Sequence, residues 1–412
     1  MKIFIMFGYG LINGTSLMLS GGTLNFWLVN VGVNLNMISL FSFTFIPYSI
    51  NFIWSYIFDI KYVPYLNKIF ANYLSWLIVI SVFLFFLLIF ISFLNPLFNI
   101  YFFAFVTFII CIFSASQDSI IGALRYQISV SDGAALSGTY VTGYRLGMLI
   151  ANFGAIFLSS FMNWSNVYRI FAFFLLILAS TFIYLSHQYL RLEKLKSNKM
   201  NIILSKKSLF VKILDILPTK NPKIIFFIIF VICFYRLGNE FLSVVINYFF
   251  YQHIGYSKLE IASIGKFCGV LGSILGSISA TYIMRKITIL NSLFFFGLLN
   301  GFSQICLILH ELIGKNLEIY FFTTLIQSFS SGMSMSSYIA FITSLCKGEY
   351  KAFQYSVFSA FMGFSRAIIP VCSGFLVTLF SWKIFFIVIS FVTISIAIFI
   401  RYFIPLIQDI IE

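Results

Sequence analysis

The sequence predicts an all-α, polytopic membrane protein with about twelve transmembrane helices in two six-helix halves. Three observations support this fold class: 61% of the 412 residues are hydrophobic, only 9% are charged, and the apolar residues form long continuous runs. Soluble domains carry about 25% charged residues, so a water-soluble fold is excluded. A span needs about 20 apolar residues and takes about 30 to 35 with its turn, so the chain length allows about twelve.

The positions of the apolar runs give the expected spans. In the first half they are 3–28, 37–58, 73–94, 98–121, 134–160 and 167–186, and in the second half 224–250, 259–282, 288–310, 317–345, 352–380 and 384–403. The run from Tyr73 to Leu94 is continuously apolar, whereas the strands of an outer-membrane barrel alternate. Met1 and Lys2 enter the first run without a small-residue cleavage site, so we expect a retained span and not a removed signal peptide.

A polar segment divides the chain into three predicted regions. They are an N-terminal six-helix bundle at 1–186, a basic cytoplasmic linker at 187–223 and a C-terminal six-helix bundle at 224–412. The linker could bind nucleotides or anionic partners, but a solvated segment beside anionic lipid headgroups has the same composition. We favour the simple linker and expect no nucleic-acid partner, although the net charge is +14.

The basic residues outside the spans are strongly segregated if the N-terminus is cytoplasmic. The outer side then holds Arg169, Lys258, Lys315 and Lys383, whereas the linker and the other inner turns hold the rest, among them Lys2, Lys61, Lys68, Arg125, Arg285, Lys286, Lys347, Lys351 and Arg401. Positive residues favour the cytoplasmic side of inner-membrane proteins. The pattern therefore predicts that both termini are cytoplasmic.

Two six-helix halves joined by a long basic loop are the layout of major-facilitator carriers. A weak internal repeat agrees with this, because Arg145 in the fifth span and Arg366 in the eleventh each follow a glycine closely. Carriers of this kind bind a small substrate near the bilayer midplane.

Ionisable residues inside the predicted spans are candidates for substrate binding. A charge at the centre of a span costs about 2.5 to 3.5 kcal/mol, so such residues normally face a partner or a water-filled cavity. The bases Arg145, Arg236, Lys266 and Arg366 outnumber the acids Asp118 and Glu240, which favours an anionic substrate. Alternatively, some of these bases lie nearer the membrane surface, and Lys266 in particular could extend outward from the start of the eighth span.

Asp118 and Glu240 are the acids best placed to take up a proton during transport. Burial favours the protonated carboxyl and a nearby arginine favours the charged form, so proton binding could change with conformation. A static ion pair, for example of Asp118 with Arg125 or Arg145, is the alternative. The three histidines, His187, His253 and His310, fall at predicted span ends, where we expect surface residues.

The first span is too polar to face lipid on all sides, so we expect it to line the transport path. Asn13 is one of its polar residues. Small residues recur at four-residue spacing in three spans, which allows close helix packing: Gly10 and Gly14, Gly143 and Gly147, and Gly272 and Gly276.

Several enzyme and ATPase motifs are missing from the sequence. There is no Walker loop, HExxH, GxSxG or GxGxxG, so we expect no enzyme activity, no cofactor and an ion gradient as the energy source. The six cysteines lie singly in or beside apolar segments, so we expect neither a metal site nor a disulfide framework.

Several segments together resemble the AmpG-like muropeptide permeases, a branch of the major facilitator superfamily. They are SLMLSGGTLNFWL (16–28), MISLFSF with Pro47 and IWSYIFD (37–59), SASQD (114–118), GYRLGML (143–149), YRLGN (235–239), SSGMS (330–334) and SLCKGEYKAFQY (344–355). The resemblance implies a bacterial inner-membrane protein that imports anhydro-muropeptides, fragments of the cell wall, together with protons for peptidoglycan recycling. The carboxylates of these fragments agree with the positive interior.

The sequence departs from the family pattern at four positions where a carboxylate is usual. They are Gly122, Asn239, Met284 and the pair that begins with Gln327. Glu240 could replace the acid missing at Asn239, but one residue along a helix turns the side chain by about 100°.

Three hypotheses follow for function. The first is the muropeptide importer, the second a carrier of another small anionic metabolite such as a sugar phosphate, nucleotide or acyl-CoA, and the third a non-transporting membrane receptor or scaffold. For a transporter, we place substrate binding at Arg145, Arg236, Arg366, Asn13 and Gln117, and proton coupling at Asp118 and Glu240.

Overall fold

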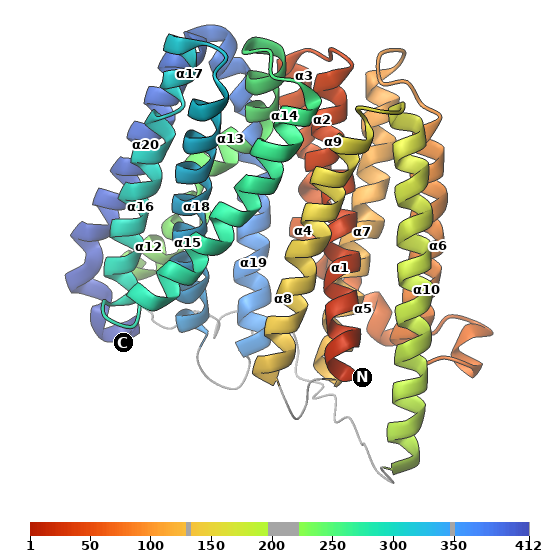
Figure 1. Cartoon of the computed structure of the whole chain (residues 1–412). Helices are drawn as coiled ribbons and strands as arrows, with labels where there is room; N and C mark the ends of the chain where they lie inside the picture. Colours follow the sequence, from red (N-terminus) through yellow and green to blue (C-terminus); the bar gives the residue numbers. More distant parts are fainter. Residues whose placement is uncertain (129–132, 197–221, 347–350, 412) are drawn as a thin grey trace. The chain divides into compact units, whose positions relative to one another are not determined.

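A computed structural model describes residues 1–128, 133–196, 222–346 and 351–411, and these residues contain helices and turns with no strand among them (Figure 1). The chain packs as two compact units. Unit 1 comprises Met1–Val33 and the described part of Ile50–Leu204, and unit 2 comprises Asn34–Ser49 and the described part of Ser205–Glu412.

Unit 1 contains most of the first half of the chain. Its elements are α1 (Lys2–Ser20), α2 (Gly22–Asn30), α5 (Phe52–Ile60), η2 (Leu66–Lys68), α6 (Asn72–Ser92), α7 (Ile100–Ile128), α8 (Gly133–Leu149), η3 (Ile150–Gly154), α9 (Ala155–Leu158) and α10 (Trp164–Lys196). Helices α1 and α2 together form the first predicted span, interrupted at Gly21. Helix α10 continues into the region predicted as linker, and the remainder of that region up to residue 221 lies outside the described residues.

Unit 2 contains the second half of the chain and a short segment of the first. Its elements are α3 (Leu35–Leu40), η1 (Phe41–Phe45), α4 (Ile46–Ile50), α12 (Pro222–Phe234), α13 (Leu237–Tyr248), η4 (Phe249–His253), α14 (Lys258–Glu260), η5 (Ile261–Cys268), α15 (Gly269–Ile283), α16 (Ile289–Ile305), α17 (Ile308–Ile313), α18 (Leu317–Leu345), α19 (Lys351–Ile368), η6 (Ile369–Cys372) and α20 (Ser373–Ile411). The second predicted span, 37–58, is therefore divided, because Asn34–Ser49 packs with unit 2 and the following residues with unit 1. The predicted boundaries of the linker, after residue 186 and after residue 223, stay a prediction.

The helices agree with the predicted fold class. Within the described residues, nine helices are long and apolar enough to cross a membrane, and one of them, Ala360–Pro405, has 46 residues. That length holds two crossings of about 20 residues each, and the backbone kinks inside it at Ser381, where φ is 68°. The tenth predicted span coincides with α18, Leu317–Leu345. The prediction of an all-α polytopic membrane protein is confirmed.

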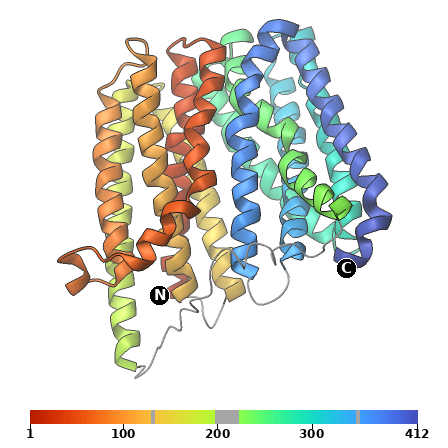
Figure 2. The same cartoon turned by 180° about the vertical axis from the view of Figure 1, so that it is seen from behind.

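In each unit, the first and last spans bring the two ends of the unit to the same side. The Lys2 ammonium lies 5.7 Å from the ring centre of Tyr189, which is near the end of α10. In unit 2, Phe227 near the start of α12 stacks on Phe403 near the end of α20, with ring centroids 5.1 Å apart. Figure 2 shows both helix pairs from behind. Both ends of a unit lie on the same side when the chain crosses the membrane an even number of times within that unit.

Glycines allow α1 and α8 to pack backbone against backbone in unit 1. A Cβ atom added at Gly14 would collide with the carbonyl oxygen of Tyr144, and one at Gly143 with that of Phe7. Gly276 approaches the carbonyl of Phe329 in the same way in unit 2. The predicted packing role of the spaced glycines is confirmed.

We expect Gly14→Ala to destabilise unit 1 by about 1 to 3 kcal/mol, because the added methyl group overpacks a contact between two backbones. The measurement is the thermal unfolding midpoint of the purified protein in detergent. Gly122→Ala is the matched control, since nothing lies within 4 Å of a Cβ atom at that helical position. Equal midpoints for the two variants would contradict this packing.

Candidate functional site

A buried polar cluster in unit 1 is centred on Asp118 of α7. The Asn13 amide on α1 donates to Asp118 Oδ1 at 2.7 Å and to the Tyr140 hydroxyl at 2.9 Å. Tyr140 on α8 donates to the same carboxylate oxygen at 3.3 Å. The Arg125 guanidinium lies 4.8 Å from the ring centre of Tyr140. Three helices thus hold one half-buried carboxylate, whose two hydrogen-bond donors, Asn13 and Tyr140, are neutral.

Gln117 lies beside this cluster and joins α1 to α6 and α7. Its Oε1 accepts from Ser16 at 2.8 Å, and its Nε2 donates to Ser81 at 3.3 Å. Arg145 lies farther along α8 and is half-buried. Unit 1 therefore brings Asn13, Gln117 and Asp118 together, which the sequence had named only as separate candidates.

In unit 2, one carboxylate lies between two guanidinium groups. Glu240 Oε1 is 3.6 Å from Arg236 Nε, and Glu240 Oε2 is 3.8 Å from Arg366 Nε. Arg236 occupies the break between α12 and α13, and Glu240 follows it by one helical turn. Glu240 is 8% exposed, whereas the Arg366 side chain is 45% exposed, so the carboxylate is buried and Arg366 reaches it from the exposed side. The structure thus joins three residues that the sequence could only name separately.

A cavity of about 270 Å³ opens in unit 2 beside this cluster. Its wall contains two cationic side chains, three amides and several hydroxyls, contributed mainly by α13, η5 and α18: Arg236, Asn239, Leu242, Ser243, Ile246, Asn247, Phe250, Gly265, Lys266, Ser273, Tyr320, Thr324, Gln327, Ser328 and Ser331. The Lys266 ammonium donates to Asn247 Oδ1 at 2.7 Å. The alternative in which Lys266 extends to the membrane surface is therefore wrong.

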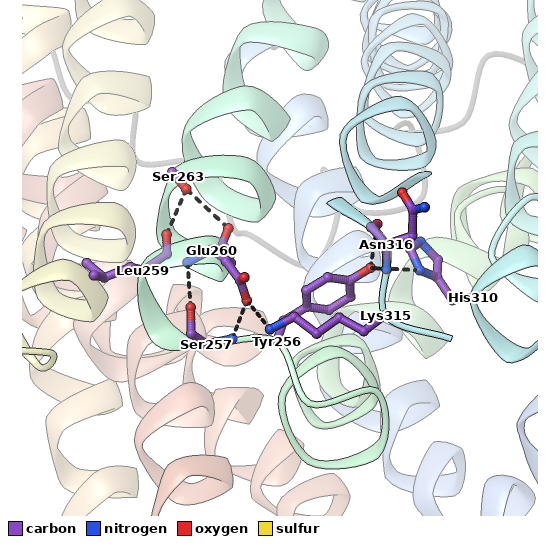
Figure 3. Close-up of polar contacts among 8 residues, drawn as sticks. All are labelled: Tyr256, Ser257, Leu259, Glu260, Ser263, His310, Lys315 and Asn316. Carbon is purple, nitrogen blue, oxygen red and sulfur yellow. Dashed lines mark hydrogen bonds and ion pairs between the residues drawn. The ribbon is translucent and has the colours of Figure 1, made fainter. Parts of the chain in front are cut away.

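Stacked aromatic rings support the cavity at Tyr320. The Tyr320 ring lies 4.4 Å from both the Phe250 and the Tyr256 ring centroids. Tyr256 in turn donates to the carbonyl of Asn316 at 2.8 Å, and Lys315 pairs with Glu260 at 2.9 Å (Figure 3). These contacts tie the turn before α18 to the turn before α14, and so fix the aromatic side of the cavity.

His310 belongs to this support and not to the surface. The side chain is 0% exposed, with Nδ1 3.3 Å from the Tyr256 hydroxyl (Figure 3). Its Nε2 lies 2.9 Å from the Thr323 hydroxyl. The expectation of a surface histidine is wrong here, because neighbouring aromatic rings cover the end of α17. His253 is exposed, as expected, and pairs with Glu311 at 2.8 Å.

The interior charges are distributed unequally between the units. Unit 2 holds Arg236, Lys266 and Arg366 against Glu240, whereas unit 1 holds Arg145 and Asp118. The positive excess predicted from the sequence therefore belongs to unit 2. Within the described residues, no three His, Cys, Asp or Glu side chains gather in a way that could hold a metal ion.

Some cavity residues were not predicted. Asn247, Tyr320 and the hydroxyl residues of α18 are neutral and of common types, and no charge distinguishes them in the sequence. The four-residue rule for helix faces offers a partial signal, since Arg236, Asn239, Ser243 and Asn247 lie on one face of α13. Two positions where the family usually has a carboxylate, Asn239 and Gln327, also lie in this wall.

The fold is that of the major facilitator class of transporters. Residues 293–409 match the family model described as Major Facilitator Superfamily. The crystal structure of a POT family transporter in complex with 5-aminolevulinic acid superposes with a TM-score of 0.70 over 100% of this chain and 96% of that one, at 14% identity. This likeness shows the fold.

The particular family follows from two relatives in Rickettsia. The transporter named AmpG 1 of Rickettsia conorii is 40% identical over 400 residues, which are 95% of each chain. The AmpG 1 protein of Rickettsia bellii is 40% identical over 396 residues, again 95% of each chain. The chain belongs to the AmpG family of membrane transporters, as the motifs predicted.

Proposed function

We propose that this protein imports anhydro-muropeptides, the anionic fragments of peptidoglycan turnover, across the bacterial inner membrane together with protons. The supporting observation is the cavity in unit 2, because its described wall contains Arg236 and Lys266 and no carboxylate. Cationic groups in a low-dielectric interior attract an anionic solute and bind its oxygens through charge-assisted hydrogen bonds. The family resemblance supports the muropeptide as that solute.

Asp118 is the proposed proton site. Among the described residues of unit 1 it is an interior carboxylate whose hydrogen-bond donors, Asn13 and Tyr140, are neutral, so it can gain a proton without losing a hydrogen bond from an arginine. Glu240, the second predicted site, lies between Arg236 and Arg366, so it would lose two ion pairs on taking up a proton. We therefore assign proton uptake to Asp118 first.

The proposed topology has both termini in the cytoplasm. Lys2, Arg285, Lys286 and Arg401 then lie on the inner side, in agreement with the positive-inside rule. Import from the periplasm would bring the substrate to the side where recycling enzymes act.

A second candidate is a carrier of a different small anion, such as a sugar phosphate, nucleotide or acyl-CoA. The observation that favours it is the pair Asn239 and Gln327 in the cavity wall, because amides there change which substrate groups can bind. A non-transporting receptor is the third hypothesis, and no described contact favours it.

Uptake of labelled anhydro-muropeptide into permease-deficient cells tests the proposal. We expect expression of this chain to restore uptake and a protonophore to abolish it, because the proton gradient drives import. The empty vector and an Arg236→Ala variant are the controls. Absence of uptake from cells in which the protein is present in the membrane would exclude the muropeptide as substrate.

A further inference from the structure

The cavity of unit 2 is surrounded by hydrogen-bond donors that lack acceptors. Arg236 Nη1 and Asn239 Nδ2 are buried without a hydrogen-bond partner, and both residues line the cavity. Buried polar groups in proteins are almost always paired. Such donors are expected to find acceptors when a ligand binds.

Lys266 adds further donor capacity on another element of the cavity wall. Its ammonium group, on η5, gives one hydrogen bond to Asn247 Oδ1, but an ammonium group carries three donors and no acceptor. The arginine and lysine side chains cannot satisfy each other, because both only donate. The missing partner is an acceptor with negative charge.

The carboxylate of Glu240 cannot be the acceptor for the donors of Arg236, Asn239 and Lys266 together. Its two oxygens already lie 3.6 Å from Arg236 Nε and 3.8 Å from Arg366 Nε, and Glu240 is not among the residues that line the cavity. Glu240 therefore acts as a positioning residue, which holds the Arg236 side chain by its Nε atom.

We propose that this cavity is an oxyanion site, in which Arg236, Asn239 and Lys266 bind a carboxylate or phosphate group of the transported solute. Asn239 contributes a neutral hydrogen-bond donor to this site, whereas an ionised aspartate at the same position could only accept. This inference rests on the proposed transport of an anionic solute and adds where its charge binds. Unit 2 alone supplies these three side chains.

Asn239→Asp is the sharpest variant, since it preserves side-chain shape and exchanges a donor for a negative charge. A like charge a few ångströms from the ligand is expected to weaken binding by about tenfold or more. Lys266→Gln removes one positive charge and should weaken binding in the same direction. Asn99→Asp is the matched control, because exposed Asn99 caps α7 through its Oδ1 atom at 2.9 Å from the Phe102 amide, and aspartate retains that bond.

The experiment is a thermal-shift titration of the purified full-length protein and the three variants. The probes are anhydro-muropeptide, its carboxamide derivative, citrate and inorganic phosphate. A ligand that binds the folded state raises the unfolding midpoint, and the stabilisation grows with the logarithm of the ligand concentration divided by its Kd, so a titration reports the affinity. We expect an oxyanion to stabilise the wild type and Asn99→Asp, and to lose about tenfold or more in affinity for Asn239→Asp and Lys266→Gln. The carboxamide should not bind.

The outcomes separate this inference from the proposed function. If citrate or phosphate binds in this pattern and the muropeptide does not, the site is supported and the muropeptide is wrong. If the muropeptide binds all four proteins equally, the site is wrong and the proposed substrate stands. A panel in which no oxyanion binds the wild type overturns the inference.

Discussion

Arg236→Ala should reduce the uptake rate at low substrate concentration by about 100-fold or more, the largest effect that we expect from a single substitution. The variant loses the guanidinium that lines the cavity, and it leaves the buried Glu240 carboxylate with Arg366 as its remaining ion-pair partner. Truncating one partner of a buried charge pair between a protein and its ligand costs about 2 to 5 kcal/mol of binding free energy, and each 1.4 kcal/mol is a factor of ten. Initial rates of labelled substrate uptake measure the loss.

The matched control for Arg236→Ala is Arg401→Ala. Arg401 is exposed and donates to Asn291 at 2.9 Å, outside the cavity. Arg401→Ala should transport at the wild-type rate, and the amount of each protein in the membrane must be equal. If Arg401→Ala lost uptake as well, the effect of Arg236→Ala would come from removing an arginine at any position and not from the change in the cavity.

Asp118→Asn should abolish accumulation against a gradient while preserving exchange of substrate across the membrane. The asparagine retains an oxygen that can accept from Asn13 and Tyr140, so the cluster keeps its hydrogen bonds, but it cannot carry a proton. If one proton enters with each substrate molecule, a gradient of one pH unit supports about tenfold accumulation of the substrate. A tenfold ratio of proton concentrations and a tenfold ratio of substrate concentrations each correspond to about 1.4 kcal/mol. The variant should reach only equal concentrations on both sides.

Two measurements on the same vesicles separate coupling from binding. Exchange of labelled for unlabelled substrate without a gradient should remain within about twofold of the wild type, and Glu318→Gln, at an exposed position on α18, should affect neither measurement. If Asp118→Asn still accumulated substrate, Asp118 would not be the proton site, and Glu240 would be the next candidate.

Most of the fold could be predicted because the bilayer constrains the sequence so strongly. Continuous apolar runs such as Asn72–Ser92 have no other stable form than a spanning helix, and even the serine-rich α18 has the predicted bounds. The second span is the exception. Its residues Asn34–Ser49 pack with unit 2, and no local hydrophobic pattern distinguishes a helix that changes partners from one that does not.

The candidate site was predictable in its charges but not in its contacts. Charged residues are costly enough inside apolar runs to stand out, so Arg236, Glu240 and Arg366 could be named. Their ion pairing depends on which helices meet, which the sequence does not state. Asn239 shows the difference, because it occupies the cavity wall while its neighbour Glu240 does not. His310 was mistaken for a surface residue because its burial depends on rings from other helices.

Uptake into proteoliposomes that contain only this protein tests the central claim most directly. With an imposed proton gradient, acid outside, the proposed import mechanism predicts that labelled anhydro-muropeptide accumulates inside, and that dissipating the gradient or substituting Arg236 by alanine stops accumulation. Accumulation that is indifferent to both the gradient and Arg236, or no transport of any anion in the panel by correctly inserted protein, would contradict it.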